Sequence, residues 1–341
     1  MTKDIGGKDL SKNSDLKIDN THLVRKCFYD GKIWTKNDLS LHTGLSHAAI
    51  TNILHYLLAT KEIEFIGEAR STGGRKSKQY IINKDYAHLG MIILKRDQFC
   101  DVFFVKICNL LGDVLFESKR ESHEGCFEEI VDIVKDMLDY DALISTLTLS
   151  IPGVCRNGEI DICDFEKLVH CHFVGDLKKR FLLDIHIEND VNVACMGLSH
   201  YYPDVMHLAL MYQPQVKYVG CGLMIQHQLY TGFSQFAGEL SYLPFLSFPE
   251  QEDMLKQNPQ QLLLYQVVSL CAVMNPQVIG VCSDVIESFD VSLLDRYLTK
   301  EHQPHIVFID QLDEYIKDGL FDLGKRMILN RKGEIENGKI Y

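Results

Sequence analysis

The stretch from residue 23 to residue 82 constrains the fold most, because it has the order of elements found in a winged helix-turn-helix. Leu23–Tyr29 has the apolar periodicity of a short helix. A second helix, Thr35–Thr43, opens with the Thr-x-x-Asp pattern of a capping box, and Gly44 supplies the turn after it. A third helix is predicted over Ser46–Ala59, with its first residue as the cap. This order of helices predicts a DNA-binding head.

The third helix is predicted to turn a polar face to solvent. Its apolar residues form one stripe, so the residues between them point away from the core. Small polar side chains on such a face can reach base edges in the major groove of DNA. The predicted DNA contacts of this region are Thr35, Ser46, His47, Thr51, Asn52 and His55.

Two short strands, Ile63–Ile66 and Gln79–Ile82, follow the third helix and enclose a glycine-rich basic loop. A flexible cationic hairpin tip suits contact with DNA phosphates or the minor groove. The predicted contacts are Arg70, Arg75, Lys76 and Lys78. Residues 1–85 contain 14 Lys and Arg against 10 Asp and Glu, whereas the other residues contain 21 against 37. An acidic body repels DNA, so we expect any contact to be confined to the head.

The composition predicts a globular protein with several domains. A chain of 341 residues is too long for one ordinary core, and a hydrophobic fraction of 46% is enough to bury more than one. Residues 1–19 are polar and are expected to form a disordered tail, which lacks the apolar core of a signal peptide. No apolar run is long enough to span a bilayer. We therefore expect a soluble, cytoplasmic protein that does not enter a membrane.

The 11 cysteines are scattered and form no CxxC pair. In a cytosolic protein, such cysteines are expected to be reduced and largely buried. A cluster at Cys163, His170, Cys171 and His172 matches no common zinc spacing. The sequence therefore predicts no metal site and no cofactor.

The body of the chain repeats one pattern of elements after a head over residues 20–85. Three strands are followed by alternating helices and strands over residues 86–200, and a similar order recurs over residues 201–341, where Val291–Thr299 is predicted as a helix. This pattern predicts two similar α/β lobes that face a cleft. Helices of the second lobe are expected to form the contacts of a dimer.

Four stretches of the body resemble motifs of the ROK family, which takes in sugar-responsive repressors and sugar kinases. The most specific is Ile187–Ala194, which resembles the family's ENDANAA motif. The others are Ser150–Gly153, Gly222–Gly232 with Phe236–Leu240, and Met274–Ile279. With the head, the resemblance covers nearly the whole chain from residue 23. It implies an actin-like (ribonuclease-H-like) pair of lobes with a sugar bound between them.

The resemblance implies that Asn189, Asp190 and Glu239 hydrogen-bond sugar hydroxyls. Carboxylates and amides held at strand ends suit this role, since they can pair with neighbouring hydroxyls. In the kinases of the family, the residue that matches Asp190 is also the general base. Two structural alternatives stay open: Asn189 or Asp190 could simply cap the helix that follows, and Glu239 could pair with a surface lysine.

The sequence departs from the family's kinases at each of their phosphate motifs. These would fall on Ile92–Arg96, Val216–Tyr218 and Cys282–Ser283, and the glycines that let phosphates approach the backbone are missing there. The family's zinc ligands are also missing, since Tyr242 stands at the position of their histidine and Leu243–Lys256 contains no cysteine. We therefore expect no catalytic residues and no ATP-dependent kinase activity.

Together these observations favour a DNA-binding transcriptional repressor of carbohydrate metabolism genes. Its partner would be double-stranded operator DNA, bound by a homodimer or homotetramer, and its effector would be a sugar or sugar phosphate in the cleft. Two alternatives are a ROK-type regulator whose sugar site no longer functions and a sugar kinase with an appended head.

Overall fold

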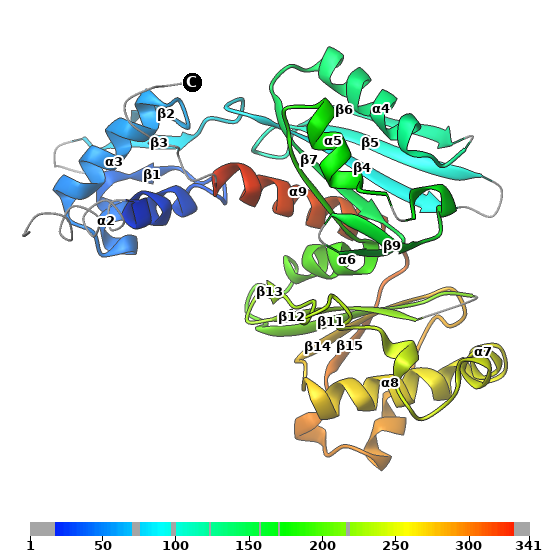
Figure 1. The fold of residues 1–341 in the computed structure, drawn as a ribbon. Coiled ribbons are helices and arrows are strands. Elements are labelled where there is room, and N and C mark those ends of the chain that lie inside the picture. Colours follow the sequence, from blue (N-terminus) through cyan, green and yellow to red (C-terminus); the bar gives the residue numbers. More distant parts are fainter. Residues whose placement is uncertain are drawn as a thin grey trace, which may run out of the picture.

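The chain folds into a small head and a two-lobed body (Figure 1). The structure is a computed structural model that describes residues 18–69, 76–96, 100–122, 124–156, 158–169, 171–215 and 219–330. The predicted α/β fold, a winged helix-turn-helix followed by a two-lobed actin-like body, is confirmed. Among the described residues, no helix has both the length and the apolar character needed to cross a bilayer.

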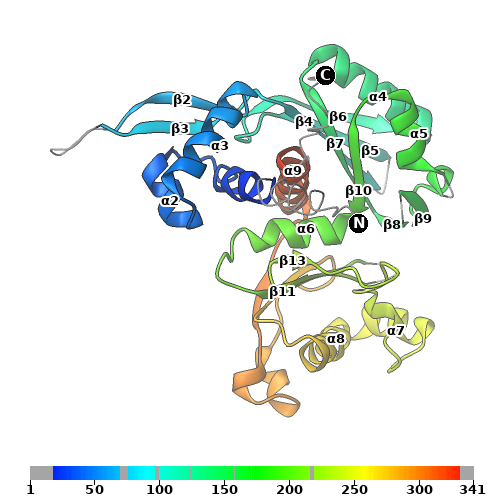
Figure 2. The ribbon, with the colours of Figure 1, turned by 60° about the vertical axis from the view of Figure 1, so that its left-hand side comes forward.

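The head consists of three helices and a three-stranded sheet of order β1-β3-β2. Its first helix spans residues 18–27 and starts earlier than the sequence predicts. The other elements are β1 Trp34–Thr35, α2 Lys36–Thr43, α3 His47–Ala59, β2 Ile63–Glu68 and β3 Lys78–Ile82. Figure 2 shows β2 and β3 extending away from the body as a long hairpin. The sequence analysis missed β1, which is only two residues long and pairs with β3.

Local side-chain contacts fix the helices of the head as predicted. Thr35 and Asp38 form the capping box of α2, and Gly44 ends that helix in the left-handed region with a φ of 72°. The hydroxyl of Ser46 accepts a hydrogen bond from a backbone amide in the first turn of α3. These contacts set the turn between α2 and α3 and so the orientation of the third helix.

The first lobe is built on a five-stranded sheet of order β10-β7-β4-β5-β6, in which β5 alone is antiparallel to the rest. Its strands are β4 His88–Arg96, β5 Asp101–Cys108, β6 Val114–Ser122, β7 Ile144–Ile151 and β10 Asp184–Asn189, with a hairpin of β8 Gly153–Arg156 and β9 Glu159–Cys163. Its helices are α4 Phe127–Tyr140, η1 Glu166–Leu168 and α5 Phe173–Arg180. The hairpin was not predicted, because its strands are only four and five residues long.

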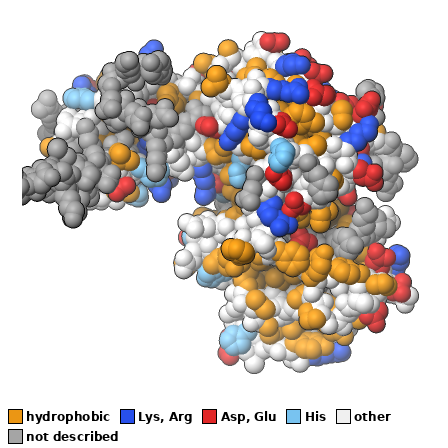
Figure 3. Space-filling model, viewed as in Figure 1, with side chains coloured by type: hydrophobic (Ala, Val, Ile, Leu, Met, Phe, Trp, Pro, Cys, Tyr) orange, Lys and Arg blue, Asp and Glu red, His pale blue; other side chains and the backbone are white. Residues whose placement is uncertain are grey.

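The second lobe repeats this topology in a sheet of order β13-β12-β11-β14-β15. Its strands are β11 His207–Gln213, β12 Gly220–Ile225, β13 Gln228–Leu229, β14 Val278–Ser283 and β15 His305–Phe308. Its helices are η2 Leu240–Tyr242, α7 Phe248–Gln257, α8 Pro259–Val273, η3 Val291–Arg296 and η4 Lys300–His302. On the face in Figure 3, hydrophobic side chains are prominent over this lobe, while charged side chains of both signs mix over the first.

Two elements of the second lobe differ from the prediction. The segment predicted as a helix over Val291–Thr299 is the shorter 3₁₀ helix η3, at whose start the Asp290 carboxylate accepts a hydrogen bond from the amide of Ser292 at 3.0 Å. The sequence analysis missed α7, although Ser247 and Glu250 form a capping box at its start and Pro249 stands in its first turn.

Two helices lie between the sheets and join the parts of the molecule: α6 Asp190–Ser199 and α9 Asp313–Leu329 (Figure 1). Although α9 follows the second lobe in sequence, it packs on α6 and on β4 and β7 of the first sheet. A Cβ atom at Gly319 would lie 2.0 Å from the carbonyl oxygen of Val193, and one at Gly197 would lie 1.9 Å from that of Tyr315. Glycine at both positions therefore lets the two helix backbones touch.

The head is packed onto the body rather than tethered to it. One buried hydrophobic cluster includes Phe28 of the head, Leu89 of the first sheet and Leu329 of α9. At the end of α9, the hydroxyl of Tyr29 donates a hydrogen bond to the side chain of Asn330. The C-terminal end of α9 is therefore part of the surface on which the head rests.

Replacing Gly319 with alanine is expected to destabilise the protein, because the added methyl group overlaps the backbone of α6. We expect the free energy of unfolding to fall by about 1–3 kcal/mol, the usual range for overpacking a core. Urea unfolding followed by circular dichroism measures it. Gly175→Ala is the matched control, since a Cβ atom at this helical glycine meets nothing within 4 Å; it should leave stability unchanged or raise it by up to about 1 kcal/mol. Equal stability of the two variants would contradict the close crossing.

Candidate functional site

The polar face predicted for α3 is exposed in the structure. Its apolar stripe, which includes Ile50 and Leu57, is buried in the head. On the opposite side, Ser46, His47, Asn52 and His55 are exposed and Thr51 is half-buried. Five of the predicted DNA contacts therefore lie on one surface of one helix.

Two of the predicted contacts have their hydroxyls engaged within the head. The Thr35 hydroxyl donates to the carboxylate of Asp38 at 2.7 Å, as part of the capping box. The Thr51 hydroxyl donates to the backbone carbonyl of His47 at 2.6 Å and accepts from the Lys36 ammonium at 3.2 Å. These residues shape the start of α2 and the surface of α3, whereas His47, Asn52 and His55 project farther from the backbone.

The wing presents part of the predicted cationic tip. Lys76 and Lys78 are exposed, and the Lys78 ammonium lies 5.7 Å from the centre of the Phe65 ring on the neighbouring strand. Arg70 and Arg75 lie outside the described residues.

A pocket lies between the two lobes, beside the start of α6. The first lobe contributes β8 and the junction of β10 with α6, and the second contributes β12 and residues 235–239. It encloses about 380 Å³ of empty space, part of which is open to solvent. Asn189 and Glu239 line this pocket, and Asp190 does not. The lining residues are Val154, Cys155, Glu188, Asn189, Asn192, Gly220, Cys221, Gln235, Ala237 and Glu239.

Asn189 is the N-cap of α6, which is one of the alternatives that the sequence left open. Its side-chain oxygen accepts a hydrogen bond from the amide of Asn192 at 3.0 Å, and its side-chain nitrogen donates to the carbonyl of Gly153 at 2.9 Å. Both ends of the amide are thus engaged with the backbone. Asn189 holds the wall of the pocket in place.

Glu188 is a pocket residue that the sequence analysis missed, although it belongs to the same motif. One carboxylate oxygen accepts hydrogen bonds from the amide of Asn189 at 2.9 Å and from the Asn192 side chain at 3.0 Å. Burial opposes ionisation of this group, but these hydrogen bonds and His186 outweigh it and hold the pKa of Glu188 below its usual value. Glu188 therefore brings a negative charge to the pocket.

Glu239 belongs to the second lobe and lines the pocket on the wall opposite Glu188. Burial raises the pKa of its carboxyl group, and no described residue forms a hydrogen bond or ion pair with that group. It follows Gly238, whose φ is 97° and whose added Cβ would lie 1.8 Å from the carbonyl oxygen of Cys221. Glycine thus lets the segment carrying Glu239 press against β12.

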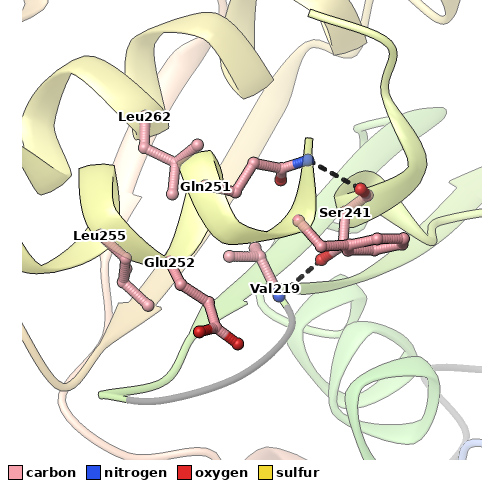
Figure 4. Close-up of a pocket in the computed structure, with 7 residues that line it drawn as sticks. Val219, Ser241, Gln251, Glu252, Leu255 and Leu262 are labelled. Atoms are coloured by element: carbon pink, nitrogen blue, oxygen red, sulfur yellow. Dashed lines mark hydrogen bonds between the residues drawn. The ribbon is translucent and has the colours of Figure 1, made fainter. Parts of the chain in front are cut away.

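The segment after Glu239 is held by α7 (Figure 4). The Gln251 side chain donates to the carbonyl of Ser241 at 2.8 Å, and the Ser241 hydroxyl accepts from the amide of Val219 at 3.1 Å. On the outer side, the ring of Tyr242 packs edge to face against Phe236 and Phe248, with centroids 4.8 and 5.0 Å away. These contacts fix the position of Glu239.

Asp190 lies apart from the pocket as the first residue of α6. Burial raises the pKa of its carboxyl group to about 7, and the negative charge of Asp164 adds to this, while a hydrogen bond from the amide of Val191 opposes it.

Side chains fill the strand ends where the resemblance places phosphate motifs. The ammonium of Lys95, at the end of β4, lies 2.8 and 3.0 Å from the two carboxylate oxygens of Asp313 on α9. Cys282 is buried in β14, and the Tyr212 hydroxyl donates to Asp284 at 2.9 Å. Residues 216–218 lie outside the described part of the chain.

Nothing in the described part of the chain groups three or more metal-ligating side chains around a point that would suit an ion. Of the cysteine and histidine cluster singled out in the sequence, Cys163 is buried, Cys171 is half-buried and His172 is exposed. His170 lies outside the described residues.

The chain is similar in sequence to proteins named xylose repressors. Over 238 residues it is 24% identical to the "Xylose repressor" of Caldicellulosiruptor bescii, a match that covers 67% of this chain and 59% of that protein. The chain thus spans about three fifths of the length of the curated relatives it matches. No family model matches the chain.

The fold is shared with a ROK transcriptional regulator and with a ROK sugar kinase. One match is the crystal structure of a ROK family transcriptional regulator, a homolog of the E. coli MLC protein. It superposes with a TM-score of 0.70 at 16% identity, over 92% of this chain and 99% of that one. A ROK hexokinase from Thermus thermophilus gives a TM-score of 0.53 at 12% identity, over 69% of this chain and 97% of that one. The chain is thus similar in sequence to proteins named xylose repressors, and its fold, a winged helix-turn-helix joined to a sugar-kinase-like body, is the fold of a ROK family transcriptional regulator.

Proposed function

We propose that this protein is a sequence-specific DNA-binding transcriptional repressor of carbohydrate metabolism genes, with a sugar or sugar phosphate as effector. The observation that carries the proposal is the exposed polar face of α3 beside a cationic wing, on a head joined to an acidic body. The sequence match to a protein named a xylose repressor supports the carbohydrate part. A homodimer or homotetramer would place two or more heads on a near-palindromic operator.

The proposed route from effector to DNA runs through the two central helices. The interlobe pocket is lined by the start of α6, and α6 crosses α9 with their backbones in contact. The end of α9 contacts the head through Asn330 and Tyr29. A ligand that binds one arrangement of the lobes more tightly than the other would therefore shift α6 and α9 and change how the head is held.

The proposal includes the absence of kinase activity, for which the filled strand ends are the physical reason. Phosphoryl transfer needs backbone amides and cations arranged around the phosphates. Here the ammonium of Lys95 is paired with Asp313. At the end of β14, the buried side chain of Cys282 stands where the resemblance places a glycine. A regulator whose sugar pocket no longer binds ligand is the second candidate, favoured by the engaged side chain of Asn189.

Asn52→Ala is expected to relax sequence selectivity, because its exposed amide is placed to pair with a base edge. A binding site is first selected from a random DNA pool, and fluorescence anisotropy then compares it with a scrambled sequence. The ratio of the two affinities should fall about tenfold or more, the usual effect of losing one base contact. An unchanged ratio would remove Asn52 from the recognition surface, and the absence of any selected sequence would remove the proposal itself.

Lys78→Gln is expected to weaken binding to all DNA sequences alike, since it removes a charge from the wing without touching α3. The slope of log affinity against log salt concentration should fall by about one unit. The same titrations measure it. Lys256→Gln, which removes an exposed charge from α7 in the second lobe, is the matched control and should leave both the affinity and the slope unchanged. Equal effects of the two substitutions would place the DNA elsewhere.

Incubation with ATP, magnesium and a panel of free hexoses and pentoses is expected to give no turnover above the rate without protein. A coupled assay of ADP formation measures it, with a purified hexokinase as positive control. Sugar-dependent ADP formation at a catalytic rate would overturn this part of the proposal and leave the DNA-binding part to be judged separately.

Asp190→Asn is expected to flatten the pH dependence of stability. Between pH 3.8 and about 7 the folded protein holds a proton on Asp190 that the unfolded chain has released, so the free energy of unfolding falls as pH rises across this window. The effect is worth about 1.4 kcal/mol for each unit of pKa shift. The variant should therefore be more stable than the original protein at pH 8, with little difference at pH 4. Urea unfolding at both pH values tests it, with the exposed Asp204→Asn as control, and identical profiles of all three proteins would contradict the raised pKa of Asp190.

A further inference from the structure

We propose that α3 reads thymine through methyl groups, with Thr51 and Ala48 as the contact residues and Lys36 as the residue that positions Thr51. The inference rests on the proposed DNA-binding function, and it names the base that this helix recognises. The hydrogen bonds of Thr51 and the side chains around it on the exposed face of α3 carry it.

The hydroxyl group of Thr51 is turned back onto the head. It donates a hydrogen bond to the backbone carbonyl of His47, one turn earlier in α3, at 2.6 Å. It accepts one at 3.2 Å from the ammonium of Lys36, in the first turn of α2. A hydroxyl has a single hydrogen to donate, so this one is not available to a base edge. The methyl group is therefore the part of Thr51 that is left to contact DNA.

Ala48 places a second methyl group beside that of Thr51. The two residues are three positions apart in α3, so their side chains are neighbours on the surface of the helix. Ala48 is exposed and Thr51 is half-buried. Their methyl groups form a small apolar area on a face whose other side chains are polar. The sequence analysis did not include Ala48 among the DNA contacts, because it selected polar residues only.

Thymine is the base that suits this apolar area. In the major groove its C5-methyl group is a distinctive apolar feature, and the methyl groups of alanine and threonine are recurring contacts for it. The commonest specific contact to guanine uses arginine or lysine, and α3 contains neither over His47–Ala59. The amide of Asn52, exposed next to Thr51, suits adenine. The face of α3 is therefore suited to A·T base pairs.

Lys36 is the residue that holds Thr51 in this orientation. Threonine in a helix has two accessible side-chain rotamers, because its hydroxyl can bond the carbonyl groups of the preceding turn. The ammonium of Lys36 reaches this hydroxyl from α2 and pairs with no carboxylate in the described part of the chain. This second hydrogen bond favours the rotamer that directs the hydroxyl to α2 and leaves the methyl group free.

Deoxyuridine substitution in the selected DNA site tests the inference on the full chain. Uracil differs from thymine only by the missing C5-methyl group. Each thymine of the site is replaced in turn, and fluorescence anisotropy measures the affinity. We expect one position in each half-site at which the affinity falls about fourfold, the effect of one buried methyl group. Full affinity at every substituted position would overturn the inference.

Thr51→Ser removes the methyl group from the protein and keeps the hydroxyl. At the sensitive position, the loss of affinity on replacing thymine with uracil should fall from about fourfold to about twofold or less, because the thymine methyl has lost part of its contact. The matched control is Thr43→Ser on α2, where the threonine hydroxyl also donates to the carbonyl four residues earlier, at 2.6 Å from Leu39. It should keep the fourfold effect. An equal effect in Thr51→Ser and in the original protein would count against the inference.

Ala48→Gly tests the second methyl group in the same way. It should also reduce the preference for thymine over uracil at the sensitive position to about twofold or less. Ala59→Gly, at the exposed end of α3, controls for the lower helix propensity of glycine and should leave the preference unchanged. Equal preferences in the two variants would remove Ala48 from the contact.

Lys36→Met separates positioning from charge. Loss of the hydrogen bond to Thr51 should lower both the affinity for DNA and the preference for thymine over uracil. Lys78→Met removes a charge from the wing and should lower the affinity while leaving the preference at its original value. An unchanged preference in Lys36→Met would overturn the positioning role of Lys36.

Selection of unmodified DNA separates failure of the inference from failure of the proposed function. If the chain selects a sequence and binds its uracil forms with full affinity, the inference is overturned and the DNA-binding function stands. If the chain selects no sequence, the proposed function falls and the inference falls with it.

Discussion

The structure depends on one close contact, the crossing of α6 and α9 at Gly319 and Gly197. Because neither glycine has a side chain, the two helix backbones meet directly, and α9 can return from the second lobe to cover the first sheet. The same pair of helices contacts three regions of the molecule. These are the pocket at the start of α6, the interface of the lobes, and the head at the end of α9. Packed backbones do not slide freely, so in the proposed mechanism a change at one end of this pair would be felt at the other.

The pocket gains its chemistry from the way its walls are stabilised. On the α6 side, the side chains of Asn189 and Glu188 form hydrogen bonds with the backbone and with Asn192, and these bonds hold that wall in place. On the other side, Gly238 and the contacts of α7 hold Glu239 against β12 with its carboxylate unpaired. One wall is therefore preorganised and the other keeps a free acceptor, an arrangement that lowers the entropic cost of binding.

Sequence patterns predicted the parts of the fold that depend on local rules. The caps at Thr35 and Ser46, the turn at Gly44 and the positions of the main strands along the chain all follow from neighbouring residues. The patterns failed where tertiary contacts decide the structure, as for the two-residue strand β1, which forms only by pairing with β3. They also left α7 unassigned, although its capping box at Ser247 and Glu250 is a local signal. The pocket residues show how far sequence patterns reach. The motif containing Asn189 was found from the sequence, but only the hydrogen bonds show that Asn189 caps α6 and that Glu188 is held by Asn192.

In the proposed mechanism, a phosphate at the end of β4 would compete with the contact that holds the start of α9. Lys95 projects from that strand end and its ammonium pairs with both carboxylate oxygens of Asp313, in the first turn of α9. If a phosphate took that position, Lys95 would turn toward it and the start of α9 would lose its ionic contact with the first sheet. The helix that supports the head would then respond to nucleotide rather than to the interlobe pocket. A side chain at this strand end that fastens α9 therefore suits a protein in which the position of α9 is itself the output.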